Sequence, residues 1–294
     1  MRFLATVLGV LALTPGVASA VAAHPTLPHT DLRLIDYRAH DGVVRRAWLL
    51  LPTDYGGAPL PLVISPHGRG TSARANARLW GDLPGIGGFA VVNPAGEGRR
   101  LGEYSWGDPG QIADLARMPA IVRAHGVHVD PRAVYAVGGS MGGQETLLLV
   151  ARHPHLLAGA AVFDAATDMA RRYWDFEELK NGPTLQHLAR EEIGGTPLTS
   201  PRAYAARSPD TYAQQIALSG VPLQLYWSTR DRVISDQIDE TGALVAAIRG
   251  WNPAAPVEVF RGTWRHTAEM RWTKRLPGAL RRFGLLTRSQ AIQI

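Results

Sequence analysis

The feature that most constrains the fold is a series of six short apolar runs, each separated from the next by a longer segment. The runs are PLVIS (61–65), FAVVN (89–93), AVYAV (133–137), AGAAVF (158–163), PLQLYWS (222–228) and PVEVF (256–260). Most of them are rich in Val, Ile, Leu or Ala without clean polar alternation, which is typical of strands buried on both faces of a parallel sheet. Helical patterns lie between them, roughly at 71–82, 109–125, 141–152, 236–249 and 268–285. Repeated strand and helix units predict an α/β fold with a doubly wound, mostly parallel sheet.

Two further features complete this prediction. The stretches LRLIDYRAH (32–40) and VVRRAWLLLP (43–52), joined at Asp41-Gly42, predict a leading antiparallel hairpin, which brings the sheet to eight strands. The alternation of strands and helices breaks once, between about residues 166 and 219. An insertion after a strand end usually lies over the carboxyl edge of such a sheet, where ligands bind. We therefore expect a small cap.

The first twenty residues, MRFLATVLGVLALTPGVASA, have the pattern of a secretory signal peptide. One positive charge is followed by an apolar run and then by small residues, which predicts cleavage near Ala20 and a secreted protein. The apolar run is too short to span a membrane, and no later stretch approaches the required length. We expect a flexible leader over residues 21–30 and one domain over residues 31–294. The chain has no cysteine, which excludes a disulfide framework and a thiol nucleophile.

One serine lies among four glycines, in the sequence VYAVGGSMGGQ (134–144). The predicted strand runs directly into Gly-Gly-Ser140-Met-Gly and a predicted helix follows, which is the context that the G-x-S-x-G nucleophile elbow requires. Small neighbours let strand and helix approach each other, and the helix N-terminus favours negative charge. Ser140 is thus the candidate nucleophile.

A serine hydroxyl needs a base, and the base needs an acid that orients it. In this type of site the acid and the histidine follow the serine in that chain order. His266, just after the last predicted strand, is the candidate base. Asp231 follows the strand PLQLYWS and is the candidate acid, with Asp236 as the alternative.

The attacked carbonyl oxygen needs two backbone N–H donors. One is expected from Met141, directly after the serine, and the other from Arg69 in the loop Pro-His-Gly-Arg-Gly (66–70) after the first buried strand. In the glycine-rich loop after strand FAVVN, Tyr104 and Trp106 are candidates for the wall of the substrate pocket, although ordinary packing explains them equally well.

These features resemble the α/β-hydrolase fold over almost the whole chain after residue 20. The stretches EEIGGTPLTSPRAYAARSPDTYAQQI and VPLQLYWSTRDRVI look like the catalytic domain of the prolyl oligopeptidase family and the related dienelactone-hydrolase-like esterases. The resemblance implies a serine hydrolase that acts through an acyl-enzyme, with no cofactor and no metal. We expect it to cleave carboxylic esters of small-molecule or polymeric substrates, because a short chain with a modest cap suits an exposed site. Hydrolysis of short peptides by a serine peptidase is the alternative.

Two other hypotheses concern binding. The first is a non-catalytic binding protein on the same scaffold, and the complete order of serine, acid and histidine argues against it. The chain is basic, with 31 Lys and Arg against 25 Asp and Glu, and the charge is densest in RWTKRLPGALRRF (271–283). This predicted C-terminal helix could bind polyanions weakly, although a solvated helix face explains it as well. No specific nucleic-acid recognition is expected.

Overall fold

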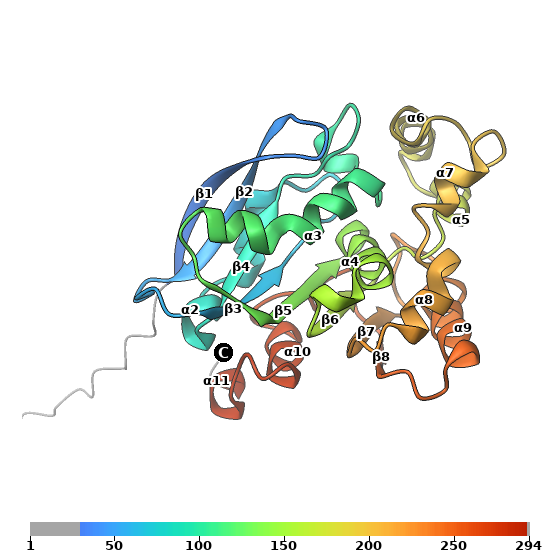
Figure 1. Cartoon of the computed structure of the whole chain (residues 1–294). Coiled ribbons are helices and arrows are strands. Elements are labelled where there is room, and N and C mark those ends of the chain that lie inside the picture. The colour runs from blue at the N-terminus through green and yellow to red at the C-terminus, as the bar shows by residue number, and fades with distance from the viewer. Residues whose placement is uncertain (1–29, 293–294) are drawn as a thin grey trace, which may run out of the picture.

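The computed structural model describes residues 30–292, so the predicted signal peptide and nearly all of the predicted leader lie outside the described residues. Its eight-stranded sheet has the order β1-β2-β4-β3-β5-β6-β7-β8 (Figure 1). The two antiparallel pairs are β1 with β2 and β2 with β4, and every other neighbouring pair is parallel. The strands are β1 (Thr30–Arg38), β2 (Val44–Pro52), β3 (Leu60–Ile64), β4 (Ala90–Pro94), β5 (Val129–Gly139), β6 (Gly159–Phe163), β7 (Leu223–Ser228) and β8 (Val257–Gly262). The predicted fold class, with its leading hairpin, is confirmed.

Helices cover both faces of the sheet, because residues of each buried strand alternate between two hydrophobic cores. On β6, for example, Val162 faces the core with α3, α4, α8 and α9, whereas Ala161 faces the core with α1, α2 and α10. The helices are α1 (Ala73–Ala77), α2 (Leu83–Gly87), α3 (Pro109–Ala124), α4 (Met141–Arg152), α5 (Met169–Asp175), α6 (Gly182–Ile193), α7 (Pro201–Ala205), α8 (Ala213–Leu218), α9 (Ala243–Trp251), α10 (Leu276–Arg282) and α11 (Arg288–Ile292). Over residues 30–292, no helix has the length and apolar character needed to cross a membrane.

The segment between β6 and β7 contains helices α5 to α8. In Figure 1, α5, α6 and α7 (yellow) are grouped together at one end of the molecule, beyond α4. Apolar side chains of this segment, among them Met169, Tyr173 and Phe176, form a third hydrophobic cluster. Trp106 and Met141 belong to the same cluster, so these helices pack directly on the start of α4.

The prediction of one helix over 268–285 is wrong in its first half. Residues 266–275 form turns and bends, and α10 begins only at Leu276, with Pro277 in its first turn, where proline is well tolerated. A tertiary hydrogen bond holds the preceding segment, because the backbone N–H of Trp272 donates to the carbonyl oxygen of Leu79 at 3.0 Å. In the same segment Thr267 has a φ of 51°, which is outside the helical range. These long-range contacts are not visible in helical periodicity.

The junction between β5 and α4 contains only Ser140. Its backbone has φ 56° and ψ −126°, a conformation that costs free energy for any residue with a side chain. A Cβ atom on Gly142 would lie 2.2 Å from the carbonyl oxygen of Pro66, and one on Gly138 would lie 2.2 Å from the carbonyl oxygen of Gly142. The glycines are therefore required because three backbone segments meet here without room for side chains.

We predict that Gly142→Ala lowers the free energy of unfolding by about 3 kcal/mol, because the new methyl group must displace backbone. The matched control is Gly250→Ala in α9, where an added Cβ meets no atom within 4 Å. That change should be neutral or stabilise the protein by up to about 1 kcal/mol. Urea unfolding curves of both variants test the prediction, and equal midpoints for the two would contradict it.

Candidate active site

Ser140 and His266, which lie far apart in the sequence, line one cavity of about 290 Å³ together with Gly68, Arg69 and Thr267. Ser140 enters from the start of α4, and His266 from the turns after β8. Both elements begin at the carboxyl ends of parallel strands, β5 and β8, which are separated in the sheet by β6 and β7. Because the carboxyl ends of parallel strands lie at one edge of the sheet, the two side chains reach the same edge.

The ring of His266 is held by Asp231. His266 Nδ1 lies 2.6 Å from Asp231 Oδ2, and because a carboxylate only accepts, Nδ1 carries the donated proton. The other oxygen, Oδ1, accepts the N–H groups of Val233 and Ile234 at 2.8 and 3.1 Å. Burial alone would raise the pKa of Asp231, but these hydrogen bonds and the imidazole lower it below its usual range. Asp231 is thus kept ionised.

The opposite ring nitrogen, His266 Nε2, is buried and has no hydrogen-bond partner among residues 30–292. It therefore makes no hydrogen bond to Ser140 Oγ in this structure, as is common for such pairs before substrate binds. The alternative acid, Asp236, lies elsewhere: its Oδ2 pairs with Arg171 at 3.0 Å. Of the two carboxylates considered from the sequence, Asp231 is the one in contact with His266.

The two backbone donors expected for an oxyanion are both free. Within the described part of the chain, neither the Met141 nor the Arg69 N–H donates a hydrogen bond, and Met141 is the first residue of α4, where no intrahelical acceptor exists. Both residues line a narrow cavity beside Ser140. His67, one residue before Gly68, is buried and its Nδ1 contacts the carbonyl oxygen of Gly68 at 2.9 Å, so it shapes this loop.

Trp106 and Tyr104 have different positions relative to Ser140. Trp106 is buried and lines the narrow cavity with Ser140, and its backbone N–H donates to the sulfur of Met141 at 3.2 Å. Tyr104 packs edge-on against Trp106, with 5.4 Å between ring centroids, and does not itself line either of the two cavities that contain Ser140. Gln144, which the sequence analysis did not single out, also lines the narrow cavity and holds the carbonyl oxygen of Trp106 through Nε2 at 3.2 Å.

A second carboxylate, Asp164, lies beside the turn that carries His266, and it was not identified from the sequence. It is fully buried, has a φ of 47°, and its Oδ2 accepts the N–H of Thr267 at 2.8 Å and the indole N–H of Trp264 at 2.9 Å. Its Oδ1 accepts the N–H of Ser228 at 2.9 Å. Burial, and then the charge of Asp231, raise the pKa of Asp164 to about 6. Its place directly after β6, at the carboxyl edge of the sheet, was the signal that could have found it.

Two groups of side chains have ligand atoms close enough together for a metal ion: Asp164 with Asp231 and His266, and His40 with Glu97 and Asp114. In the first group the hydrogen bonds described above already engage the carboxylates. In the second, Tyr37 donates to Glu97 Oε1, His40 Nδ1 lies 2.9 Å from both Glu97 Oε2 and Asp114 Oδ2, and Arg117 pairs with Asp114. Among the carboxylate oxygens of these two groups, Glu97 Oε2 is buried and has no hydrogen-bond partner within residues 30–292.

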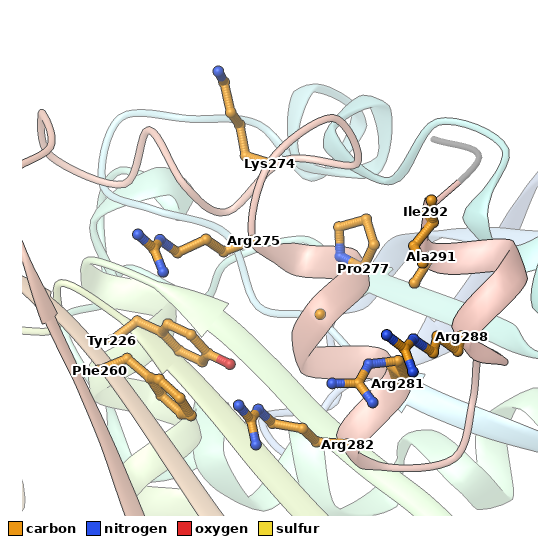
Figure 2. A pocket seen from close by; sticks show the side chains of 11 residues that line it. Tyr226, Phe260, Lys274, Arg275, Pro277, Arg281, Arg282, Arg288, Ala291 and Ile292 are labelled. Carbon is orange, nitrogen blue, oxygen red and sulfur yellow. The ribbon is translucent and has the colours of Figure 1, made fainter.

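A strongly basic cavity lies away from Ser140. It has about 640 Å³ and is formed by α10 and α11 over Tyr226 and Phe260. Figure 2 shows its cationic side chains spread around the opening: Lys274, Arg275, Arg281, Arg282 and Arg288. Arg275 and Arg282 have carboxylate partners, Glu269 and Glu258. The other three form no ion pair within residues 30–292.

A family model, a relative and solved structures match this chain. The model of the prolyl oligopeptidase family matches residues 88–253, more than half of the chain. The protein named "Putative esterase NocK" from Nocardia uniformis subsp. tsuyamanensis is 35% identical over 113 residues, which are 36% of this chain and 32% of that protein. The matched segment thus spans about a third of this relative's length.

Solved structures share the fold at low identity. The acylaminoacyl peptidase of Pyrococcus horikoshii superposes with a TM-score of 0.67 at 15% identity, over 87% of this chain but 42% of that one. An esterase of Pyrococcus furiosus has a TM-score of 0.61 at 17% identity, over 86% of this chain and 91% of that one. A structure from work on two esterases of Rhizomucor miehei has a TM-score of 0.66 at 14% identity, over 91% and 86%.

Proposed function

Because the chain belongs to the prolyl oligopeptidase family and is therefore a serine hydrolase, we propose that it hydrolyses carboxylic esters with Ser140 as nucleophile, His266 as base and Asp231 as the orienting acid. The observation that carries this proposal is the 2.6 Å contact between His266 Nδ1 and Asp231, which leaves Nε2 unpartnered in the cavity that Ser140 also lines.

In the proposed mechanism, Ser140 Oγ attacks the acyl carbonyl carbon while His266 Nε2 takes the hydroxyl proton. The negative charge that develops on the carbonyl oxygen is stabilised by the N–H groups of Met141 and Arg69. Collapse of the tetrahedral intermediate breaks the bond to the alcohol, which leaves with the proton from His266. Water then attacks the acyl-enzyme, His266 again acting as base, and the acid is released with Ser140 restored. Asp231 stabilises the imidazolium at each stage.

Ester hydrolysis ranks above peptide hydrolysis for two reasons. The two esterase structures align with this chain over 91% and 86% of their own lengths, against 42% for the acylaminoacyl peptidase. The relative with 35% identity also carries an esterase description. Cleavage of short peptides by the same three residues is the second candidate, favoured by the family itself.

Asp164 has a positioning role in this proposal. It touches neither Ser140 nor the imidazole through a hydrogen bond, but it holds the backbone N–H of Thr267, the residue after His266, and the indole of Trp264 before it. Two of its three hydrogen bonds thus fix the turn that carries the base. We infer that it sets the orientation of His266 toward Ser140.

Export and polyanion binding are also part of the proposed function. The signal-peptide pattern of the first twenty residues supports secretion. At the cell exterior, the cations Lys274, Arg281 and Arg288, which have no ion-pair partner within residues 30–292, could attract an anionic polymer to the basic cavity.

We predict that the purified protein hydrolyses p-nitrophenyl acyl esters at least about tenfold more efficiently than aminoacyl or peptidyl nitroanilides. Ser140→Ala should abolish both activities while leaving the circular dichroism spectrum unchanged, because only the nucleophile is lost. Steady-state kinetics with both substrate classes test this. Amide turnover equal to ester turnover would reverse the ranking, and wild-type rates in the variant would refute the nucleophile.

For Asp164→Asn, we predict a fall in kcat/KM of about tenfold at pH 8, because the amide places N–H donors where N–H groups of the His266 turn need an acceptor. The pKa of Asp164 is about 6, so the wild-type carboxylate is ionised at pH 8 and the difference should shrink as the pH falls through 6. Asp236→Asn is the control, since Asp236 pairs with Arg171 of α5 and accepts the N–H of Asp239, away from His266. Equal pH profiles for wild type and Asp164→Asn would contradict the positioning role.

For the basic cavity, we predict that the double variant Arg281→Gln, Arg288→Gln elutes from a heparin column at lower salt. The slope of log affinity against log salt should fall by up to about 2, one for each lost contact. The control removes the same charge at Arg33 and Arg46, which pair with Asp31 and Asp36. If both double variants elute together, net charge alone explains the binding.

A further inference from the structure

Two arginines from different parts of the chain meet beside Ser140. Arg69 lies in the loop after β3, and Arg172 lies in α5 of the cap. Both line the narrow cavity that contains Ser140. Their guanidinium groups lie over the same aromatic ring, that of Phe176, at 5.4 Å and 4.7 Å from its centroid. Two positive charges are therefore brought together next to the nucleophile.

Neither guanidinium has an acidic partner. Within residues 30–292 no carboxylate oxygen lies within 4.0 Å of the guanidinium nitrogens of Arg69 or Arg172. In contrast, Arg171, directly before Arg172 in the sequence, pairs with both Asp236 and Asp239. Arg172 is only 4% exposed, and its Nη1 is buried with no hydrogen-bond partner. A comparably buried arginine, Arg207, instead contacts Asp108 at 2.6 Å. Arg172 is thus an exception within this chain.

The cost of this arrangement is not offset by the aromatic ring. A desolvated cation over a ring gains about 2 kcal/mol, whereas burying an ion costs several kcal/mol. Burial, and then the charge of Arg69, lower the pKa of Arg172 to about 10. Asp175, one turn along α5, is close enough to oppose this lowering but forms no ion pair with Arg172. An anion bound in the cavity would offset both the burial of the Arg172 charge and its repulsion by Arg69.

The position of the two cations indicates which part of a substrate they meet. The leaving group must lie next to His266, which gives it a proton, and His266 lines the larger cavity but not the narrow one. The narrow cavity therefore faces the acyl part of the substrate. Its free volume is about 10 Å³, room for little more than one water-sized group, so the acyl chain must be short and must also occupy the larger cavity, which shares Ser140 and Arg69 with it.

We propose that Arg69 and Arg172 bind a carboxylate at the end of a short acyl chain, so that the preferred substrates are half-esters of short dicarboxylic acids. This proposal rests on the proposed function, since it uses Ser140 as the nucleophile and His266 as the proton donor to the leaving group. Guanidinium and carboxylate groups match as paired donors and acceptors, and the low exposure of Arg172 strengthens that attraction.

The test compares monomethyl glutarate with dimethyl glutarate at pH 8, by titrating the acid released. The two esters differ only in whether the far carboxyl is ionised or methylated. In the wild type, kcat/KM for the half-ester should exceed that for the diester by about 30-fold. Arg172→Met and Arg69→Met should each reduce this ratio at least about tenfold, and Arg172→Lys should reduce it less, because charge remains but the planar fork is lost.

Arg171→Met is the matched control, because it removes the same charge from the adjacent position of α5, where the side chain pairs with Asp236 and Asp239. This variant should keep the wild-type ratio. A wild-type ratio near or below one would overturn the proposal. So would an equal loss on both esters in Arg172→Met, which would assign the residue to packing on Phe176 or to balancing Asp175.

A binding measurement separates this proposal from the proposed function. Calorimetry with Ser140→Ala should detect monomethyl glutarate and show about 30-fold weaker binding of the diester. If the wild type hydrolyses neither ester but the variant shows this preference, the anion site stands and the proposed ester hydrolysis fails. If the diester is hydrolysed but neither kinetics nor binding favours the anion, the proposed function stands and the anion site fails.

Discussion

The rest of the site depends on one steric constraint, the meeting of three backbone segments around Ser140. The end of β5, the start of α4 and the loop after β3 approach so closely that Gly138 and Gly142 have no space for a Cβ atom. This contact forces Ser140 into a strained conformation and presents it at a helix N-terminus. It also places the free N–H groups of Met141 and Arg69 at the same narrow cavity. The proposed nucleophile and the proposed oxyanion donors are therefore positioned by a single backbone arrangement.

The position of His266 depends not on steric contact but on a set of hydrogen bonds. Asp231 holds the ring through Nδ1, while Asp164 holds the turn on which the ring sits. The two buried carboxylates repel each other, and the pKa of Asp231 is lowered while that of Asp164 is raised. The two pKa values shift in opposite directions because the hydrogen-bond donors differ. Asp231 accepts from the imidazole, which becomes cationic in the proposed reaction, whereas Asp164 accepts only from neutral N–H groups.

The segment between β6 and β7 adds charge to this framework. Its aromatic side chains pack with Trp106 and Met141, and α5 places Arg172 beside Arg69 in the cavity that contains Ser140. A cap that served only to exclude water would be better built from apolar side chains, because burial of an unpaired guanidinium costs free energy. In the proposed reaction these cations give the pocket a chemical preference that the fold alone does not specify, since function depends on the site and not on the fold.

The sequence by itself determined the order of strands and helices, the elbow at Ser140 and the chain order of serine, acid and histidine. These follow from local patterns: apolar runs, glycines around one serine, and polar residues directly after strands. Only the tertiary structure decided which carboxylate contacts His266, because Asp231 and Asp236 lie in the same short loop and differ in direction, not in spacing. It also decided that residues 268–275 are turns and that Asp164 and Arg172 reach the site. These depend on contacts between residues distant in the chain, for which local sequence carries no signal.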